Sequence, residues 1–392
     1  MNKPDRDIVL FLGAGFSCNA GLPLMAEFGE EAKKQIGLQE QAEAKRDSKD
    51  FRYAAPLLVS AQETFEGFQK LLEQKQVLTI EETRNMETVF CIAEALYESG
   101  VKTIDINGSP KGIEVLIEEI QLWLWKTYQQ FPPENPLRKN KIEIKVLENF
   151  FKIIKDVNVQ GKITVLSTNY DLVYEYCSKE SNIPCAYPLS WDKDFRAGFG
   201  NEHYISQFDE AEGKTIVCKL HGSVNFFENT TESDKKLFVA SDLCDGQSIG
   251  NSKIRKNLPA LFAVDSIWNI RNKYGNGYVP AIIPPTYAKL RGYPWLREIW
   301  KEAFEAVKNA NKIIFIGYSF PDSDGFMHAF FQGALAMKSN QIQPDIYLVD
   351  PDPNDKVHKR YKKFFNSNFK SREPLSLKKA IECNFFSELF ER

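Results

Sequence analysis

The sequence lacks several features that would assign a chain at once to a common class of protein. Its seven cysteines are scattered singly with no Cys-x-x-Cys pair, so neither a zinc ribbon nor a disulfide framework is expected. No apolar run approaches the ~20 residues of a membrane span, and the N-terminus shows no secretory signal segment. A net charge of −3 does not favour binding to nucleic acid through bulk charge. We therefore expect a reduced, cytoplasmic, metal-free protein with no membrane contact and no direct nucleic-acid binding.

The chain is long enough for two or three packed units, since it has 392 residues. Residues 51–128 follow helical spacing, and no strand-like alternation appears among them. An apolar stripe at helical spacing is formed by Ile113, Leu116, Ile117, Ile120 and Leu124. This pattern predicts a large helical insert after the first strand, and residues 144–154 are expected to form the helix that returns to the sheet.

A glycine-rich loop follows the first apolar run, residues 8–12, which is typical of a strand buried on both faces of a parallel sheet. Gly13, Ala14 and Gly15 turn the chain, and a helix is expected to begin near Ser17. Small residues here let backbone amides approach a phosphate, which the N-terminus of a helix also favours. A tight turn without any ligand needs glycine as well. The loop has neither the full GxGxxG spacing nor the Lys-Ser/Thr of a P-loop, and Ser17 has no GxSxG context.

Further apolar runs, each predicted to be a strand, end in small, polar or ionisable residues. The runs cover residues 162–167, 215–220, 281–283, 312–316 and 345–349. The segments that follow them are Thr168-Asn169-Tyr170-Asp171, His221-Gly222-Ser223, Pro284-Pro285, Gly317-Tyr318-Ser319 and Asp350-Pro351. Ligands of open parallel α/β sheets bind outside the carboxyl ends of the strands. The sequence therefore predicts an α/β fold with a Rossmann-like parallel sheet and a ligand site along one edge, beside a smaller irregular module in residues 185–214 and 224–280.

Three of these side chains are candidates for chemistry. Asn169 and Asp171 stand two apart after a buried strand, where they could act on a ligand or simply begin the next helix. His221 ends a strand with glycine beside it, and its ordinary pKa near neutrality suits a general base. The four histidines show no metal-ligand spacing.

Together these segments resemble the sirtuin-type NAD-binding fold. The chain shows, in the order of that family, GAGFSCNAGLP, STNYD, KLHGS, a GYS segment and LVDP. It departs from sirtuin deacylases in having Leu24-Met25-Ala26 where Asp-Phe-Arg is expected, Thr168 in place of glutamine, and no paired Cys-x-x-Cys motifs. With these departures it looks more like the sirtuin-like effectors of prokaryotic antiphage defence, which hydrolyse NAD and include the partner of HerA-type ATPases.

The resemblance implies an NAD glycohydrolase that converts NAD, its substrate, into nicotinamide and ADP-ribose. It implies that Asn169 holds the ribose or the attacking water, that His221 acts as base, and that Asp171 orients Asn169 or the loop. The remaining binding residues that it implies are Gly13, Ala14, Gly15 and Ser17 for the pyrophosphate, Thr168 beside them, and Gly317, Ser319 and Asp350 for the adenosine half.

The resemblance also implies an organisation and a set of partners. We expect a catalytic domain in residues 1–30 and 160–355, a helical insert in 31–159 and a basic, helical tail in 356–392. An enzyme that destroys NAD must be restrained, so a homo-oligomer that works with a HerA-type ATPase is expected. An NAD-dependent protein deacylase and a non-catalytic NAD or ADP-ribose sensor remain as alternatives. For the basic residues of the tail, a solvated helix face is favoured over a contact with an acidic partner.

Overall fold

The computed structural model describes most of the chain. The described residues are 8–24, 54–83, 85–128, 144–158, 163–189, 205–206, 213–229, 237–239, 278–283, 292–322, 324–338 and 342–391. The Pro284-Pro285 segment and most of the irregular module lie outside them.

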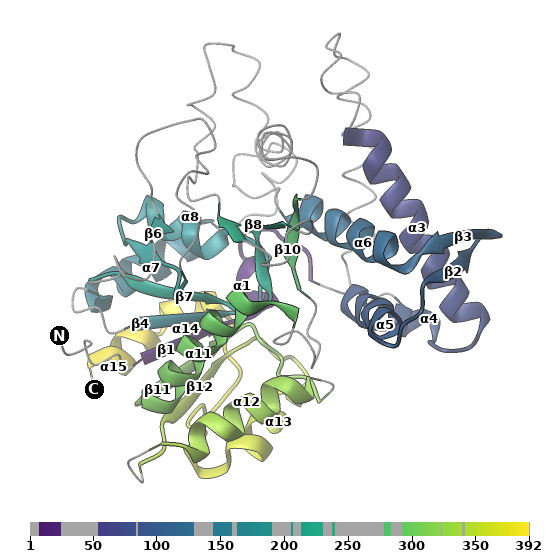
Figure 1. The fold of residues 1–392 in the computed structure, drawn as a ribbon. Coiled ribbons are helices and arrows are strands. Elements are labelled where there is room, and N and C mark those ends of the chain that lie inside the picture. The colour runs from purple at the N-terminus through teal and green to yellow at the C-terminus, as the bar shows by residue number, and fades with distance from the viewer. Residues whose placement is uncertain are drawn as a thin grey trace, which may run out of the picture.

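A seven-stranded sheet forms the centre of the fold (Figure 1). Its strands are β1 (Ile8–Leu12), β4 (Ile163–Ser167), β5 (Cys185–Ala186), β6 (Ile205–Ser206), β7 (Thr215–Lys219), β11 (Lys312–Ile316) and β12 (Asp345–Val349). They lie in the order β12-β11-β1-β4-β7-β5-β6, and every pair is parallel. This confirms the predicted Rossmann-like α/β sheet.

Helices cover both faces of this sheet. They are α7 (Ile144–Asn158), α8 (Val173–Glu180), α11 (Pro294–Asn309), α12 (Gly325–Ala336), α13 (Lys356–Phe365), α14 (Leu377–Glu382) and α15 (Phe385–Glu391), with the short 3-10 helix η4 (Asn366–Asn368) after α13. Phe11 and Phe315 are paired in register, and both rings contact Phe331 of α12. Tyr347 of β12 points to the opposite face, where its ring contacts Phe385 of α15. The sheet is therefore buried on both sides, as its almost wholly apolar strands require.

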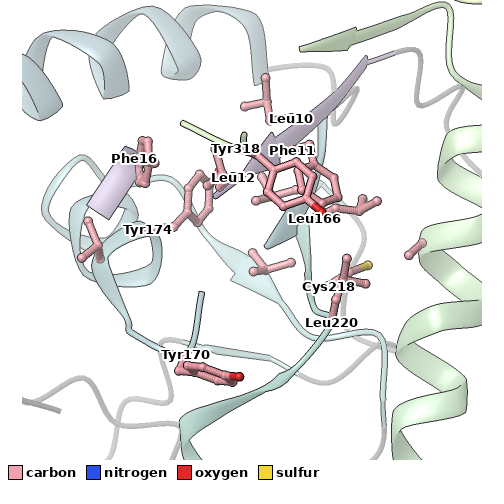
Figure 2. Close-up of a cluster of buried hydrophobic side chains, with 14 of the residues drawn as sticks. Leu10, Phe11, Leu12, Phe16, Leu166, Tyr170, Tyr174, Cys218, Leu220 and Tyr318 are labelled. Atoms are coloured by element: carbon pink, nitrogen blue, oxygen red, sulfur yellow. The ribbon is translucent and has the colours of Figure 1, made fainter. Parts of the chain in front are cut away.

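Apolar side chains fill the space beneath the carboxyl ends of β1, β4 and β7. Figure 2 shows Leu12, Phe11, Leu166 and Cys218 in this cluster, with the ring of Tyr318 beside Phe11. The centroids of those two rings are 4.7 Å apart. The edge that carries the candidate residues is thus packed directly against the hydrophobic core.

The basic tail packs on the sheet through its apolar side chains. Tyr361 and Phe365 of α13 are buried, and their rings contact Phe315. The lysines of the helix lie on its outer side, where Lys356, Lys359, Lys362 and Lys363 are exposed. This arrangement agrees with a solvated helix face.

The helical insert contains a hairpin that the sequence pattern did not predict. Its helices are α3 (Ala54–Gln74), α4 (Ile80–Thr83), α5 (Met86–Glu98) and α6 (Ile113–Tyr128), and strands β2 (Thr103–Ile106) and β3 (Ser109–Gly112) pair antiparallel between α5 and α6. Asn107 and Gly108 both have positive φ, as a two-residue type I′ turn requires. The expectation of a region without strands was therefore wrong, and the Asn-Gly pair was the missed signal.

A second sheet, of antiparallel strands, begins at the candidate site. Strands β8 (Gly222–Asn229), β9 (Leu237–Val239) and β10 (Tyr278–Ile282) lie in the order β10-β8-β9. The prediction that the run 281–283 is a strand of the parallel sheet was wrong, because it belongs to β10. Its direction could not be deduced from three apolar residues, and the register of β10 shifts after Pro280, which has no N–H to donate.

Helix α6 connects the insert to this second sheet and lies beside β10 in Figure 1. The side chain of Gln121 donates a hydrogen bond to the backbone carbonyl of Ile282 at 3.0 Å. The indole of Trp125 donates to the carbonyl of Val224 at 2.8 Å. None of the described helices is long and apolar enough to span a membrane.

Substitution of Gly222 tests how closely the backbone of β10 packs against the start of β8. It has a φ of +78°, and a Cβ there would lie 1.9 Å from the carbonyl oxygen of Ala281. Gly100 has nearly the same φ, +82°, with nothing within 4 Å. Gly100→Ala should cost about 1–2 kcal/mol for the left-handed backbone. Gly222→Ala should cost about 1–3 kcal/mol more, because of the overlap with β10.

Thermal unfolding of the two variants measures this difference. The melting temperature of Gly222→Ala should fall clearly below that of Gly100→Ala. Equal melting temperatures would show that β10 does not pack against Gly222 as described.

Candidate active site at the carboxyl edge of the sheet

Five consecutive strands end side by side at one edge of the parallel sheet. Gly13, Thr168, Leu220, Gly317 and Asp350 follow β1, β4, β7, β11 and β12. Backbone N–H groups just past the strand ends continue the ladder: Gly13 donates to Ile316 at 3.0 Å, Thr168 to Leu12 at 3.2 Å, Leu220 to Ser167 at 2.9 Å and Gly317 to Val349 at 2.9 Å. The structure thus places the predicted residues along one edge.

The glycines of the first loop are in contact with the loop after β11. A Cβ on Gly13 would lie 2.5 Å from the carbonyl oxygen of Gly317, and one on Gly15 would lie 2.7 Å from the Cα of Gly317. Gly317 has a φ of +64°, and its own Cβ would lie 2.3 Å from the nitrogen of Phe16. Each glycine is therefore required by backbone packing within the protein, whatever binds at the edge.

This packing also uses most of the amides of the loop. The N–H of Gly15 donates to the carbonyl of Gly317 at 2.9 Å, and that of Phe16 donates to Gly13 at 3.0 Å. The helix starts at Ala14 rather than near Ser17, since α1 comprises Ala14–Cys18. The amide of Ala14 makes no hydrogen bond with another described residue, so it is a donor that this loop offers a ligand.

Asn169 connects the end of β4 to the glycine loop. Its Nδ2 donates to the carbonyl of Gly13 at 2.8 Å and to the Oγ of Ser17 at 3.0 Å. Its own backbone N–H donates to the Oγ of Ser167 at 3.1 Å. Asn169 is buried, and both amide hydrogens are used. Its Oδ1 accepts no hydrogen bond from the described residues, so it remains an acceptor for a ligand or water.

Asp171 holds the turn that follows Asn169. Its Oδ1 accepts a hydrogen bond from the N–H of Val173 at 2.9 Å, at the start of α8. This is the helix-beginning role that the sequence left open. Its carbonyl oxygen accepts a hydrogen bond from the ammonium of Lys219.

His221 lies after β7, the strand next to β4, and is 2% exposed. Its ring meets the ring of Tyr170 edge-on, with centroids 6.2 Å apart. Its carbonyl accepts from the N–H of Ile283 at 2.9 Å. The indole of Trp300 donates to the neighbouring carbonyl of Leu220 at 2.9 Å. His221 and Asn169 thus stand on neighbouring strand ends, and Tyr170, the residue after Asn169, is in ring contact with His221.

A buried polar cluster beside these residues was missed by the sequence analysis. Lys219 is 1% exposed, and its Nζ lies 3.4 Å from the Oε1 of Glu175, which is fully buried. The hydroxyl of Tyr187 donates to the same oxygen at 3.1 Å. The pKa of Glu175 is raised above its ordinary value, because the effect of burial outweighs the opposing effect of the nearby Lys219 ammonium. The sequence did hold a signal for this cluster: Lys219 lies within an apolar run predicted to be a buried strand, and a buried charge needs a partner.

The far end of the edge is more open. Ser319 is exposed, and its carbonyl accepts a hydrogen bond from Arg360. Asp350 is half-buried, burial raises the pKa of its carboxyl, and its Oδ1 accepts from the N–H of Asp352 at 3.0 Å. The hydroxyl of Tyr318 donates to the Oδ2 of Asp324 at 2.5 Å. Ser319 and Asp350 therefore lie on the same edge as Asn169 but two to three strands away.

Comparison with protein families assigns this architecture. The model of the SIR2-like domain matches residues 163–370, more than half of the chain. The chain belongs to the SIR2-like domain family. This membership indicates an NAD-dependent activity in general terms. The match extends through α13, the helix that packs on β11.

Solved SIR2 structures are also similar to this SIR2-like chain. One is Sir2Tm bound to a propionylated peptide, with 12% identity, a TM-score of 0.34, and coverage of 98% of this chain and 92% of that chain. Another is SIR2 in complex with the inhibitor EX-527, 2'-O-acetyl-ADP-ribose and deacetylated p53-peptide, with 12% identity, a TM-score of 0.35, and coverage of 98% and 93%. No curated protein sequence matches the chain. Among the described residues, no cluster of three or more histidine, cysteine or acidic side chains could hold a metal ion.

Asn169→Asp tests whether this side chain holds the SIR2-like loop in place. The substitution puts an acceptor where the amide donates to Gly13, so it should lower the free energy of unfolding by about 1–3 kcal/mol. Ser17→Ala is the control, because it removes one of the two bonds and should cost about 1 kcal/mol. Both are measured by thermal unfolding. An Asn169→Asp protein as stable as the wild type would contradict the described contact.

Proposed function

We propose that this chain is an NAD glycohydrolase, which cleaves the bond between nicotinamide and ribose and releases nicotinamide and ADP-ribose. The SIR2-like family supports NAD as the substrate. The observation that carries the proposal is the position of Asn169 and His221 on the neighbouring ends of β4 and β7, beside the loop of Gly13 and Ser17. This edge of an open parallel sheet is where ligands bind.

The chemistry asks for two groups near the ribose. Loss of nicotinamide builds oxocarbenium character at the sugar carbon, which water then attacks. The free Oδ1 of Asn169 can accept a hydrogen bond from that water or from a ribose hydroxyl. His221 can take the proton of the water as general base. Because His221 is buried beside Tyr170, bulk solvent is kept from it and the proton transfer is confined to the bound water.

The rest of NAD is assigned to the other strand ends. We assign the pyrophosphate to the loop of Gly13, Ala14, Gly15 and Ser17, with Thr168 beside it. Within that loop the amide of Ala14 is one available donor, whereas those of Gly13 and Gly15 are used inside the protein. We assign the adenosine half to Gly317, Ser319 and Asp350, where the half-buried carboxyl can accept from ribose hydroxyls.

Product analysis of NAD turnover tests the proposal. Purified protein incubated with NAD, with and without its partner protein, should release nicotinamide and ADP-ribose in equal amounts. His221→Ala should slow this release by about 10²–10⁴-fold, which is typical for loss of a positioned general base. His358→Gln is the matched control, since His358 lies on α13, its Nε2 bonds the carbonyl of Ser371, and an amide can replace that bond.

Other products would favour the other two functions. Acyl-ADP-ribose formed only with an acylated peptide would establish a deacylase. NAD that binds and is never cleaved, even with the partner present, would establish a sensor. Near-normal release by His221→Ala would contradict the assigned base.

We further propose that the chain is an NAD-depleting effector of antiphage defence. The resemblance to the sirtuin-like partners of HerA-type ATPases supports this role. In it the chain forms a homo-oligomer through the helical insert and works with such an ATPase. Light scattering at micromolar concentration should show a mass above that of one chain, and a further increase on adding the ATPase. A monomer with full NAD turnover alone would contradict this arrangement.

A further inference from the structure

One buried side chain joins the two turns that carry Asn169 and His221. Lys219 is the last residue of β7, two positions before His221, and is paired in register with Ser167 at the end of β4. Its Nζ donates to the carbonyl of Asp171, two positions after Asn169. Lys219 therefore connects the end of one strand to the turn that follows its neighbour.

Glu175 provides the counter-charge for this lysine. Its Oε1 lies 3.4 Å from the Nζ of Lys219 and accepts a hydrogen bond from the hydroxyl of Tyr187. Because Glu175 is in the first turns of α8, which begins directly after Asp171, the ion pair also fixes the start of that helix against β7. The ammonium thus bridges three segments: the end of β7, the turn at Asp171 and α8.

Stability alone gives a weak reason for burying this pair. Desolvating a lysine and a glutamate costs several kcal/mol each, and well-packed neutral side chains of similar size are often equally stable or more so. What a neutral replacement cannot reproduce is the directed bond to the carbonyl of Asp171. Among the described residues, the two turns are also joined at Tyr170, whose carbonyl accepts from the N–H of Val224 at 2.9 Å and from the Oγ of Ser223 at 3.3 Å.

We propose that Lys219 is a positioning residue for the NAD reaction: it holds the turn of residues 168–172 against the end of β7, and so fixes Asn169 relative to His221. This inference rests on the proposed function, since it concerns the same two residues. Lys219 touches no reacting atom in this account. Its effect is on the geometry in which Asn169 and His221 meet the ribose and the water, so it acts on turnover more than on NAD binding.

The test removes the bond without leaving a lone buried charge. In Lys219→Met/Glu175→Gln both charges are gone, and the amide oxygen introduced at position 175 can still accept from Tyr187. Nicotinamide release at saturating NAD should fall by about 10²-fold, the loss typical of a misplaced reacting group, while KM changes by a few-fold. Hydrogen exchange should show faster exchange of the amides of residues 168–173 by about tenfold, reporting local opening of that turn.

Two variants serve as controls. Tyr187→Phe removes the hydroxyl bond to Glu175 but keeps both charges and the bond from Lys219 to Asp171, so turnover should stay within a few-fold of the wild type. Lys111→Met/Glu119→Gln removes an ion pair of 2.6 Å in the insert and should change neither readout. If the double variant at Lys219 does not fold, Lys219→Leu/Glu175→Gln replaces it, because leucine also has no donor for the carbonyl of Asp171 and no buried charge is left.

The outcomes separate this inference from the proposed function. Unchanged exchange at residues 168–173, or faster exchange with unchanged turnover, overturns the positioning role. A wild type that releases no nicotinamide overturns the proposed function instead. In that case faster exchange in the double variant still supports the inference that Lys219 holds the turn of residues 168–172. Unchanged exchange overturns that inference.

Discussion

The contact between two glycine turns determines the geometry of the whole edge. Gly13 and Gly15, after β1, lie against Gly317, after β11, at distances that no Cβ would allow. Two backbone hydrogen bonds join the turns: the N–H of Gly13 donates to the carbonyl of Ile316, and the N–H of Gly15 donates to the carbonyl of Gly317. Because β1 and β11 are neighbouring strands inside the sheet, this contact sets how closely the loops on either side can approach a ligand.

Side chains extend this arrangement along the edge from β1 through β4 to β7. Asn169 bonds the loop of Gly13 to the end of β4, and Lys219 bonds the turn after β4 to the end of β7. Beyond His221 the chain enters the antiparallel sheet, where Trp125 of α6 bonds Val224. The helical insert is thereby connected, through a backbone carbonyl, to β8, the strand that directly follows His221. A displacement of α6 would therefore act first on the His221 end of the edge.

The position of the edge could be predicted from the sequence, because parallel apolar strands place their carboxyl ends together. The structural reason for glycine at positions 13, 15 and 317 could not be predicted, since the contact of Gly13 with Gly317 joins residues far apart in the chain. The lysine at 219 gave a signal, a charge within a buried strand, but no pattern identifies Glu175 as its partner. The direction of β10 was also beyond the sequence, because three apolar residues fit either sheet.

The central claim is that NAD binds along the carboxyl edge of the parallel sheet. Hydrogen exchange with an NAD analogue whose nicotinamide–ribose bond cannot be cleaved measures this directly. The account predicts slower exchange in the segments 13–18, 168–173, 220–224 and 317–320, with no change in α3 or in the β2–β3 hairpin. Protection confined to the insert or to the C-terminal helices, with none at the strand ends, would contradict it.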